Sequence, residues 1–167
     1  MVNSTASVQV PQNKGGGVLE DITALVADSA ALYLAEPNIR IAMIRHGIPA
    51  MTIGSLSSRM GLSKEYLLSI LGLSRATISR REKDAALLSS DESERVLGVA
   101  SLIGMVHTMV EQSGDPTNFD PALWVAGWLA APLPALAGAA PASYMDTFEG
   151  QKLVADLLAM SQSGAYA

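Results

Sequence analysis

Residues 63–83 read SKEYLLSILGLSRATISRREK, and this stretch decides the expected fold. Ser63 is a natural helix N-cap, because its hydroxyl can accept a hydrogen bond from a backbone N–H in the first turn. Gly72 then breaks the chain, and Ser74 caps a second helix, which Ile78 is expected to anchor in the core. A helix, a glycine turn and a capped helix form the helix-turn-helix arrangement. The residues of the first helix expected to face inward are Tyr66, Leu67, Ile70 and Leu71.

Basic residues gather in this part of the chain, although the chain as a whole is acidic. The formal net charge is −5, yet residues 38–84 hold eight of the eleven Lys and Arg side chains and carry a net charge of +5. Residues 1–37 carry a net charge of −3, and residues 85–167 carry −7. One basic segment in an acidic chain favours a polyanion as its partner and a different partner for the acidic segments.

The second helix of the motif is a candidate for the major groove of DNA. In a helix-turn-helix the N-terminal residues of this helix meet base edges, and the backbone N–H groups at its start can bind a phosphate. The spacing places Arg75 and Thr77 toward bases and the later basic residues toward phosphates or late base contacts. The alternative is an ordinary solvated helix whose arginines keep the protein soluble. The predicted DNA-binding residues are Ser63, Lys64, Ser74, Arg75, Thr77, Ser79, Arg80, Arg81 and Lys83.

The composition argues against catalysis. The chain has no cysteine, which excludes a disulfide framework, thiolate chemistry and any cysteine-containing metal site. Its two histidines, His46 and His107, stand far apart in the sequence. There is no phosphate loop, no nucleophile motif with a plausible base and no metal-ligand spacing. We therefore expect a protein that is not an enzyme, with no catalytic residue, no metal site, no cofactor and no small-molecule substrate.

The rest of the chain is predicted to be helical, so the expected fold class is all-α. Residues 1–17 are polar and end in three glycines, which is typical of a disordered lead. We expect a helix-turn-helix domain for DNA binding over residues 18–86. A small helical domain is expected over residues 87–167, with the boundary between Asp84 and Ser89.

Helical spacing of apolar residues predicts the further helices. One helix is expected from Val18 until Pro37 stops it, and Trp124 and Trp128 are expected to be core residues rather than contacts. The remaining helices are expected over residues 41–46, about 50–60, from a capping box of Ser89 and Glu92 to Gly114, from Asp120 onward, and about 147–160.

Residues 121–145 form an uncharged run that is long enough to cross a bilayer. The run contains three prolines and is flanked by Asp120 and Asp146, whereas spanning helices rarely hold three prolines and their cytoplasmic flanks favour Lys or Arg. We therefore expect these residues to form part of the core of a soluble protein and a surface that contacts a partner, rather than a membrane span. The first residues lack the basic start and apolar core of a signal peptide, and we expect a cytoplasmic protein without a membrane partner.

From about Ile39 to the end, the chain resembles the antitoxins of the Xre/MbcA/ParS class, which pair with RES-domain toxins. Alanines stand at Ala139 and Ala140 where the family has bulkier or polar residues. The motifs that carry the resemblance are Gly47-Ile48-Pro49, Leu71-Gly72-Leu73-Ser74-x-x-Thr77-x-x-Arg80-Arg81, Trp128-Leu129, Pro134-x-Leu136-x-Gly138-x-x-Pro141, Asp146-Thr147-x-x-Gly150-x-x-x-Val154 and Gly164-Ala165-Tyr166-Ala167.

The resemblance implies an N-terminal Xre/Cro-like helix-turn-helix region, a small helical toxin-binding domain after it, and two tasks for the protein. Antitoxins of this class form homodimers and larger toxin–antitoxin complexes, bind their own operator DNA through the helix-turn-helix, and hold a toxin through the C-terminal domain. Their RES toxins consume NAD, and the last helix and tail of the antitoxin block the cofactor pocket. The residues that the resemblance assigns to toxin binding are Gly150, Val154, Leu157, Gly164, Ala165, Tyr166 and Ala167.

Two other classes of function stay open from the residues alone. The first is a stand-alone helix-turn-helix transcription regulator whose second domain senses a small molecule or only dimerises. The second is a small enzyme. A neighbouring toxin reading frame or a stable co-purified partner would separate the antitoxin from both.

Overall fold

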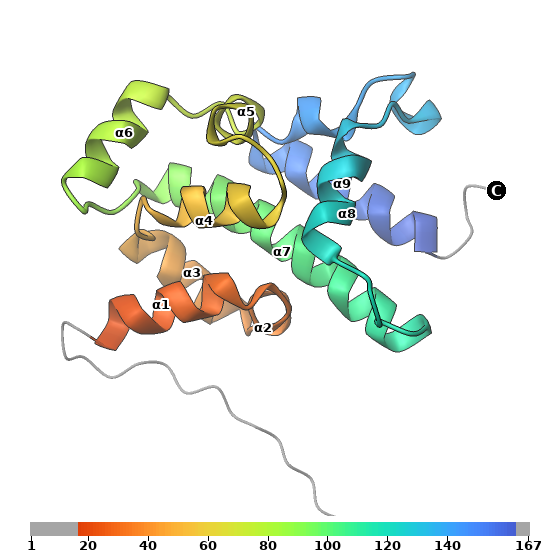
Figure 1. Cartoon of the computed structure of the whole chain (residues 1–167), viewed down its shortest axis with the longest axis horizontal. Coiled ribbons are helices and arrows are strands. Elements are labelled where there is room, and N and C mark those ends of the chain that lie inside the picture. Colours follow the sequence, from red (N-terminus) through yellow and green to blue (C-terminus); the bar gives the residue numbers. More distant parts are fainter. Residues whose placement is uncertain (1–16, 163–167) are drawn as a thin grey trace, which may run out of the picture.

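The computed structural model describes residues 17–162 and shows an all-helical fold (Figure 1). Within these residues there is no β-strand, as the sequence predicts. The elements are α1 (Gly17–Ala27), α2 (Ser29–Leu34), α3 (Pro37–His46), α4 (Thr52–Arg59), α5 (Lys64–Ile70), α6 (Arg75–Lys83), α7 (Ser90–Ser113), α8 (Pro121–Ala130), the 3₁₀ turns η1 (Pro134–Leu136) and η2 (Pro141–Tyr144), and α9 (Phe148–Gln162).

The long helix α7 is the centre of the molecule. It packs against α2 and α3 on one side and against α8 and α9 on the other (Figure 1). The predicted capping box starts it: Glu92 N donates to Ser89 Oγ at 3.2 Å, and Ser89 N donates to Glu92 Oε2 at 2.8 Å. Buried residues of α7 join those of both halves of the chain in one continuous apolar core.

The helix-turn-helix consists of α5 and α6, preceded by α4. Ser63 Oγ accepts from Tyr66 N at 3.1 Å, and Ser74 Oγ accepts from Thr77 N at 3.3 Å, so both predicted caps are confirmed. Gly72 between the helices has φ +61°, a left-handed conformation that glycine adopts without strain. Leu67, Ile70 and Leu71 are buried as expected, whereas Tyr66 is exposed.

The segments before α4 and after α6 pair with each other. Ala50 N donates to Ala86 O at 3.0 Å, and Leu88 N donates to Ile48 O at 2.8 Å. Gly47 lies so close to this pairing that a Cβ there would stand 2.5 Å from Leu88 O. The predicted domain boundary at residue 86 therefore falls in a segment that hydrogen-bonds to the helix-turn-helix half.

The N-terminal region differs from the single helix that the apolar spacing predicts. The Asp28 side chain accepts from Ala31 N at 3.0 Å and starts a new helix, α2, directly after α1. Pro37 does not end a helix but begins α3, because the first position of a helix needs no N–H donor. The lead predicted over residues 1–17 lies outside the described residues, except for Gly17, which begins α1.

The uncharged run of residues 121–145 folds as α8 and two short 3₁₀ turns. Asp120 caps α8 by accepting from Ala122 N at 2.9 Å, and Pro121 is its first residue, as predicted. Leu133 N and Ala139 O close the loop around η1 at 3.1 Å. Among the helices of residues 17–162, none combines the length and apolar character needed to cross a membrane.

Candidate functional site

The exposed surface of α6 carries three basic side chains. Arg75, Arg80 and Lys83 are exposed, whereas Ile78 is fully buried and fixes the helix to the core, as predicted. Arg75 Nη2 lies 3.5 Å from Glu65 Oε1, but both side chains are more than half exposed and solvent screens this pair. The helix therefore presents positive charge at the edge of the molecule, where α6 projects in Figure 1.

The hydroxyl residues predicted to bind DNA occupy the helix starts and the α6 surface. Ser63, Ser74 and Ser79 are exposed, and Thr77 is half-buried. The Ser63 and Ser74 hydroxyls each satisfy one N–H of the first turn of α5 and α6, and such a first turn has further N–H groups without a partner inside the helix. A phosphate at the start of α6 would meet these donors and the positive end of the helix dipole.

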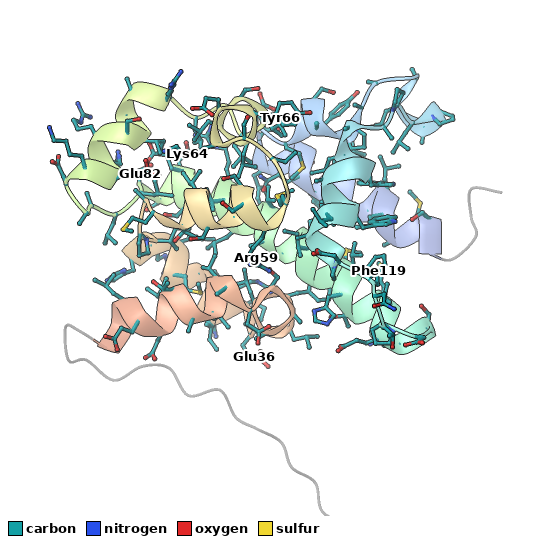
Figure 2. The ribbon with its side chains drawn as sticks, viewed as in Figure 1. Glu36, Arg59, Lys64, Tyr66, Glu82 and Phe119 are labelled. Atoms are coloured by element: carbon teal, nitrogen blue, oxygen red, sulfur yellow. The ribbon has the colours of Figure 1, made fainter. Side chains whose placement is uncertain are left out.

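Lys64 pairs with an acidic residue of the same motif. Its Nζ donates to Glu82 Oε2 at 2.7 Å, and this ion pair lies between α5 and α6 (Figure 2). The two side chains are 32% and 20% exposed, so the pair is partly shielded from solvent. Lys64 thus holds the two helices of the motif together, and its charge is largely balanced within the chain.

Arg81 is directed at the start of α7. Its Nη1 donates to Leu87 O at 2.8 Å, and its Nη2 lies 3.4 Å from Glu92 Oε2, the carboxylate of the capping box. The side chain is half-buried between these partners. Arg81 therefore fixes α6 to α7, while Arg75, Arg80 and Lys83 supply the exposed charge.

The second candidate surface lies on the C-terminal half. Val154 has no exposed surface, and Leu157 and Gly150 are also buried, so these three predicted toxin-binding residues face the core. A Cβ on Gly150 would stand 1.9 Å from Tyr144 O, which explains the glycine at this close approach of α9 to η2. Gly164, Ala165, Tyr166 and Ala167 lie outside the described residues.

Comparison with known proteins finds a matching protein family for each half of the chain. Residues 39–101 match the family model of the antitoxin Xre-like helix-turn-helix domain, and residues 118–164 match that of the antitoxin Xre/MbcA/ParS C-terminal toxin-binding domain. The Prs ADP-ribosylating antitoxin of Sphingobium sp. (strain YBL2) is 40% identical over 137 residues, which is 82% of this chain and 86% of that protein. The chain belongs to the Xre/MbcA/ParS antitoxins. The resemblance seen in the sequence is thereby confirmed, and the protein is an antitoxin rather than an enzyme.

The antitoxin exposes apolar side chains within the toxin-binding match that the sequence analysis did not select. Trp124 is 41% exposed, contrary to the expected core position, and stacks on the half-buried Trp128 with ring centroids 6.2 Å apart. Phe119 tilts against Trp124 at 6.4 Å. The other exposed apolar residues of α8 and α9 are Leu123, Phe148, Leu153 and Met160. The signal in the sequence was the i, i+4 spacing of the two tryptophans, which places both on the same side of the helix.

The described part of the antitoxin brings no metal-ligating side chains together. Between residues 17 and 162, no three His, Asp or Glu side chains gather in an arrangement that could hold a metal ion. His107 instead lies 3.3 Å from Glu111, one turn further along α7. The chemistry available on the described surface is therefore charge on α6 and apolar contact on α8 and α9.

Proposed function

We propose that this antitoxin neutralises an NAD-consuming RES-domain toxin with residues 87–167 and represses its own operon by binding operator DNA with residues 18–86. The observation that supports this most directly is the presence, in one chain, of a helix-turn-helix match with exposed basic side chains and a toxin-binding match. The name of the Sphingobium relative refers to ADP-ribosylation, a reaction that draws ADP-ribose from NAD. We expect the protein to carry out both tasks in the cytoplasm, where operator DNA and NAD occur together.

The DNA-binding task is assigned to the start and exposed side of α6. Arg75, Thr77 and Ser79 meet base edges, and Arg80 and Lys83 meet phosphates, with the N-terminus of α6 at a further phosphate. Lys64 and Arg81 contribute by holding α5, α6 and α7 in place. The antitoxin binds as a homodimer, because two copies of the motif fit two half-sites on successive turns of the major groove.

The toxin-binding task is assigned to the C-terminal tail and the exposed residues of α8 and α9. Residues 164–167 include an aromatic ring, Tyr166, which has the planar shape of the base of a dinucleotide. Gly150, Val154 and Leu157 hold α9 in the position from which the tail extends. The net charge of −7 over residues 85–167 complements a pocket built for phosphates.

The deciding experiment measures NAD consumption by the RES-domain protein encoded beside this chain. We expect equimolar full-length antitoxin to stop NAD turnover, because its tail fills the cofactor pocket. Deleting residues 164–167 should restore turnover while the two proteins still co-elute on size exclusion, since α8 and α9 keep the docking surface.

Other results would assign the chain differently. Undiminished turnover with the full-length protein would leave a stand-alone DNA-binding regulator whose C-terminal domain has another partner. Full inhibition by the truncated protein would move the blocking element from the tail to the described surface of α8 and α9. Binding to a promoter fragment, measured on the same samples, tests the operator-binding task independently.

A further inference from the structure

The turn of the helix-turn-helix is held by a residue of the central helix. Arg95 on α7 donates from Nη1 to Leu71 O at 2.8 Å and to Gly72 O at 3.1 Å. Its Nη2 pairs with Asp91, one turn earlier on α7, and the side chain is 17% exposed. Carbonyls at the end of a helix carry partial negative charge and need donors, so the guanidinium satisfies the C-terminus of α5.

The same turn touches the beginning of the toxin-binding region. A Cβ on Gly72 would stand 3.2 Å from Cβ of Asp146 and 3.4 Å from Nη1 of Arg95. Asp146 lies between η2 and α9, two residues after Tyr144, and η2 packs against α5. The turn that leads into α6 therefore contacts both α7 and the segment before α9, and a side chain at Gly72 would be in tight contact with Asp146 and Arg95.

A buried amide continues this connection into α9. Gln151 is 8% exposed, and its Nε2 donates to Arg95 O at 2.9 Å and to Met145 O at 3.0 Å. A Cβ on Gly98 would stand 1.8 Å from Gln151 Oε1, so the glycine on α7 provides the space for the amide. Residue 95 therefore contacts α9 through its backbone carbonyl and the turn before α6 through its guanidinium.

These contacts join the segment that matches the helix-turn-helix family model to the segment that matches the toxin-binding family model. Arg95 lies inside the helix-turn-helix match, which extends to residue 101, and Gln151 lies inside the toxin-binding match. Ser74, the N-cap of α6, follows Gly72 by two residues, so the position of the turn fixes where the recognition helix begins. A shift at the turn redirects Arg75 and the first-turn N–H groups of α6 together.

We propose that Arg95 is a positioning residue for the recognition helix and that Gln151, Arg95 and Gly72 transmit toxin binding on α9 to operator affinity. The inference rests on the proposed function and adds to it the route of regulation. Coupling between two binding sites is reciprocal, so operator DNA must change toxin affinity by the same factor as toxin changes operator affinity.

The test compares operator Kd with and without saturating toxin for the full chain and for Arg95→Ala. Coupled sites typically change each other's affinity 5- to 150-fold, and we expect the wild-type ratio to be on the order of tenfold. In Arg95→Ala the ratio should fall to within about twofold of one, because the link between Gln151 and the turn is lost. Toxin Kd without DNA should stay unchanged.

Arg40 offers a matched control on the opposite half of the core. Its Nη1 donates to Tyr33 O and Ala35 O, both at 2.9 Å, and so satisfies the end of α2 as Arg95 satisfies the end of α5. Arg40→Ala removes a similar capping arginine but leaves the turn at Gly72 intact. We expect this variant to keep the wild-type ratio.

The salt dependence of operator binding separates positioning from direct DNA contact. In a plot of the logarithm of the binding constant K against the logarithm of the salt concentration, each phosphate contact adds about 0.9 to the steepness of the decrease. Arg95→Ala alone should bind the operator several-fold more weakly with an unchanged slope. A slope that falls by about one would assign Arg95 to a phosphate instead and would overturn the proposal.

A second variant covers the case in which Arg95→Ala does not fold. Gln151→Leu keeps the volume of the side chain and removes its two donated hydrogen bonds, so it should also bring the ratio toward one. The inference is overturned if the ratio of operator Kd with and without toxin is near one in the wild type, while both binding events persist. It is also overturned if folded Arg95→Ala or Gln151→Leu keeps the same ratio as the wild type. Absence of either binding event in the wild type would instead refute the proposed function, and the inference with it.

Discussion

The basic residues of α5 and α6 have different roles despite their proximity in the sequence. Lys64 and Arg81 satisfy acidic or carbonyl partners within the chain at 2.7 and 2.8 Å. Arg80 and Lys83 are exposed, and Arg75 meets Glu65 only in a solvent-exposed pair at 3.5 Å. A side chain that already has a partner must lose it before it binds a phosphate, so we expect the exposed residues to contribute most to DNA affinity.

The double substitution Arg75→Ala with Arg80→Ala should weaken operator binding. The salt slope of log K should fall by about 0.9 for each phosphate contact removed, because fewer counterions are released. Fluorescence anisotropy with labelled operator at several salt concentrations measures both quantities. Inhibition of the toxin should be unaffected.

Arg45 provides the control for the loss of a positive charge. It is exposed in the last turn of α3, outside the helix-turn-helix. Arg45→Ala should leave the salt slope almost as in the wild type. If the Arg75 and Arg80 double variant also kept its slope and affinity, the assignment of α6 as the recognition helix would be wrong.

At the scale of elements, α8 and α9 differ in what they offer a partner. The predicted toxin-binding residues of α9 are buried against α7 and η2, and its exposed apolar residues include Phe148, which is 60% exposed. α8 presents the stacked Trp124 and Trp128 with Phe119 beside them. Tryptophan is among the residues enriched at the energetic centre of protein interfaces.

Trp124→Ala should weaken toxin binding by about tenfold or more, as expected for a tryptophan at the centre of an interface. The free energy of unfolding should fall by only about 1 kcal/mol, since the substitution removes one exposed aromatic pair. Isothermal titration with toxin and denaturant unfolding give the two values. Met51, 65% exposed before α4, is the matched control, and Met51→Ala should keep toxin affinity. Equal toxin affinity of Trp124→Ala and wild type would remove α8 from the interface.

At the scale of the molecule, α7 makes the two functional halves one folding unit. Its glycines allow close approach: a Cβ on Gly104 would stand 1.8 Å from Ser29 O at the crossing with α2. Buried residues from α1 to α9 belong to the same apolar core. A chain with one continuous core is expected to unfold in a single cooperative transition.

Gly104→Ala should destabilise the antitoxin by about 3 kcal/mol, because the methyl group forces α2 away from α7. Gly127→Ala is the matched control, since nothing lies within 4 Å of a Cβ there and alanine should stabilise α8 by about 0.5–1 kcal/mol. Tryptophan fluorescence reports on α8, and far-UV circular dichroism reports on all helices. Both signals should shift together in Gly104→Ala, and separate transitions would show that the halves unfold independently.

Local hydrogen bonds explain why much of the fold was predictable. The caps at Ser63, Ser74, Ser89 and Asp120 each join a side chain to a backbone N–H two or three residues away, so the sequence determines them. The same holds for the helix-turn-helix and for the order of motifs that indicates the family. The N-terminal helix was mispredicted because apolar spacing does not register a cap such as Asp28 inside a helical run.

Only the tertiary structure decided which of the predicted site residues are available. Arg81 turns toward α7, Val154 turns into the core, and Trp124 turns outward, although helical spacing alone allows each of them either direction. The contact from Gln151 to Arg95 joins residues 56 positions apart, and the one from Arg95 to Leu71 spans 24. Such pairs depend on how the helices pack around α7. Apart from the N-terminal region, the sequence by itself determined the helices, their caps and the family, because these follow from neighbouring residues. Burial and the link between the two functional halves arise instead from packing of distant segments.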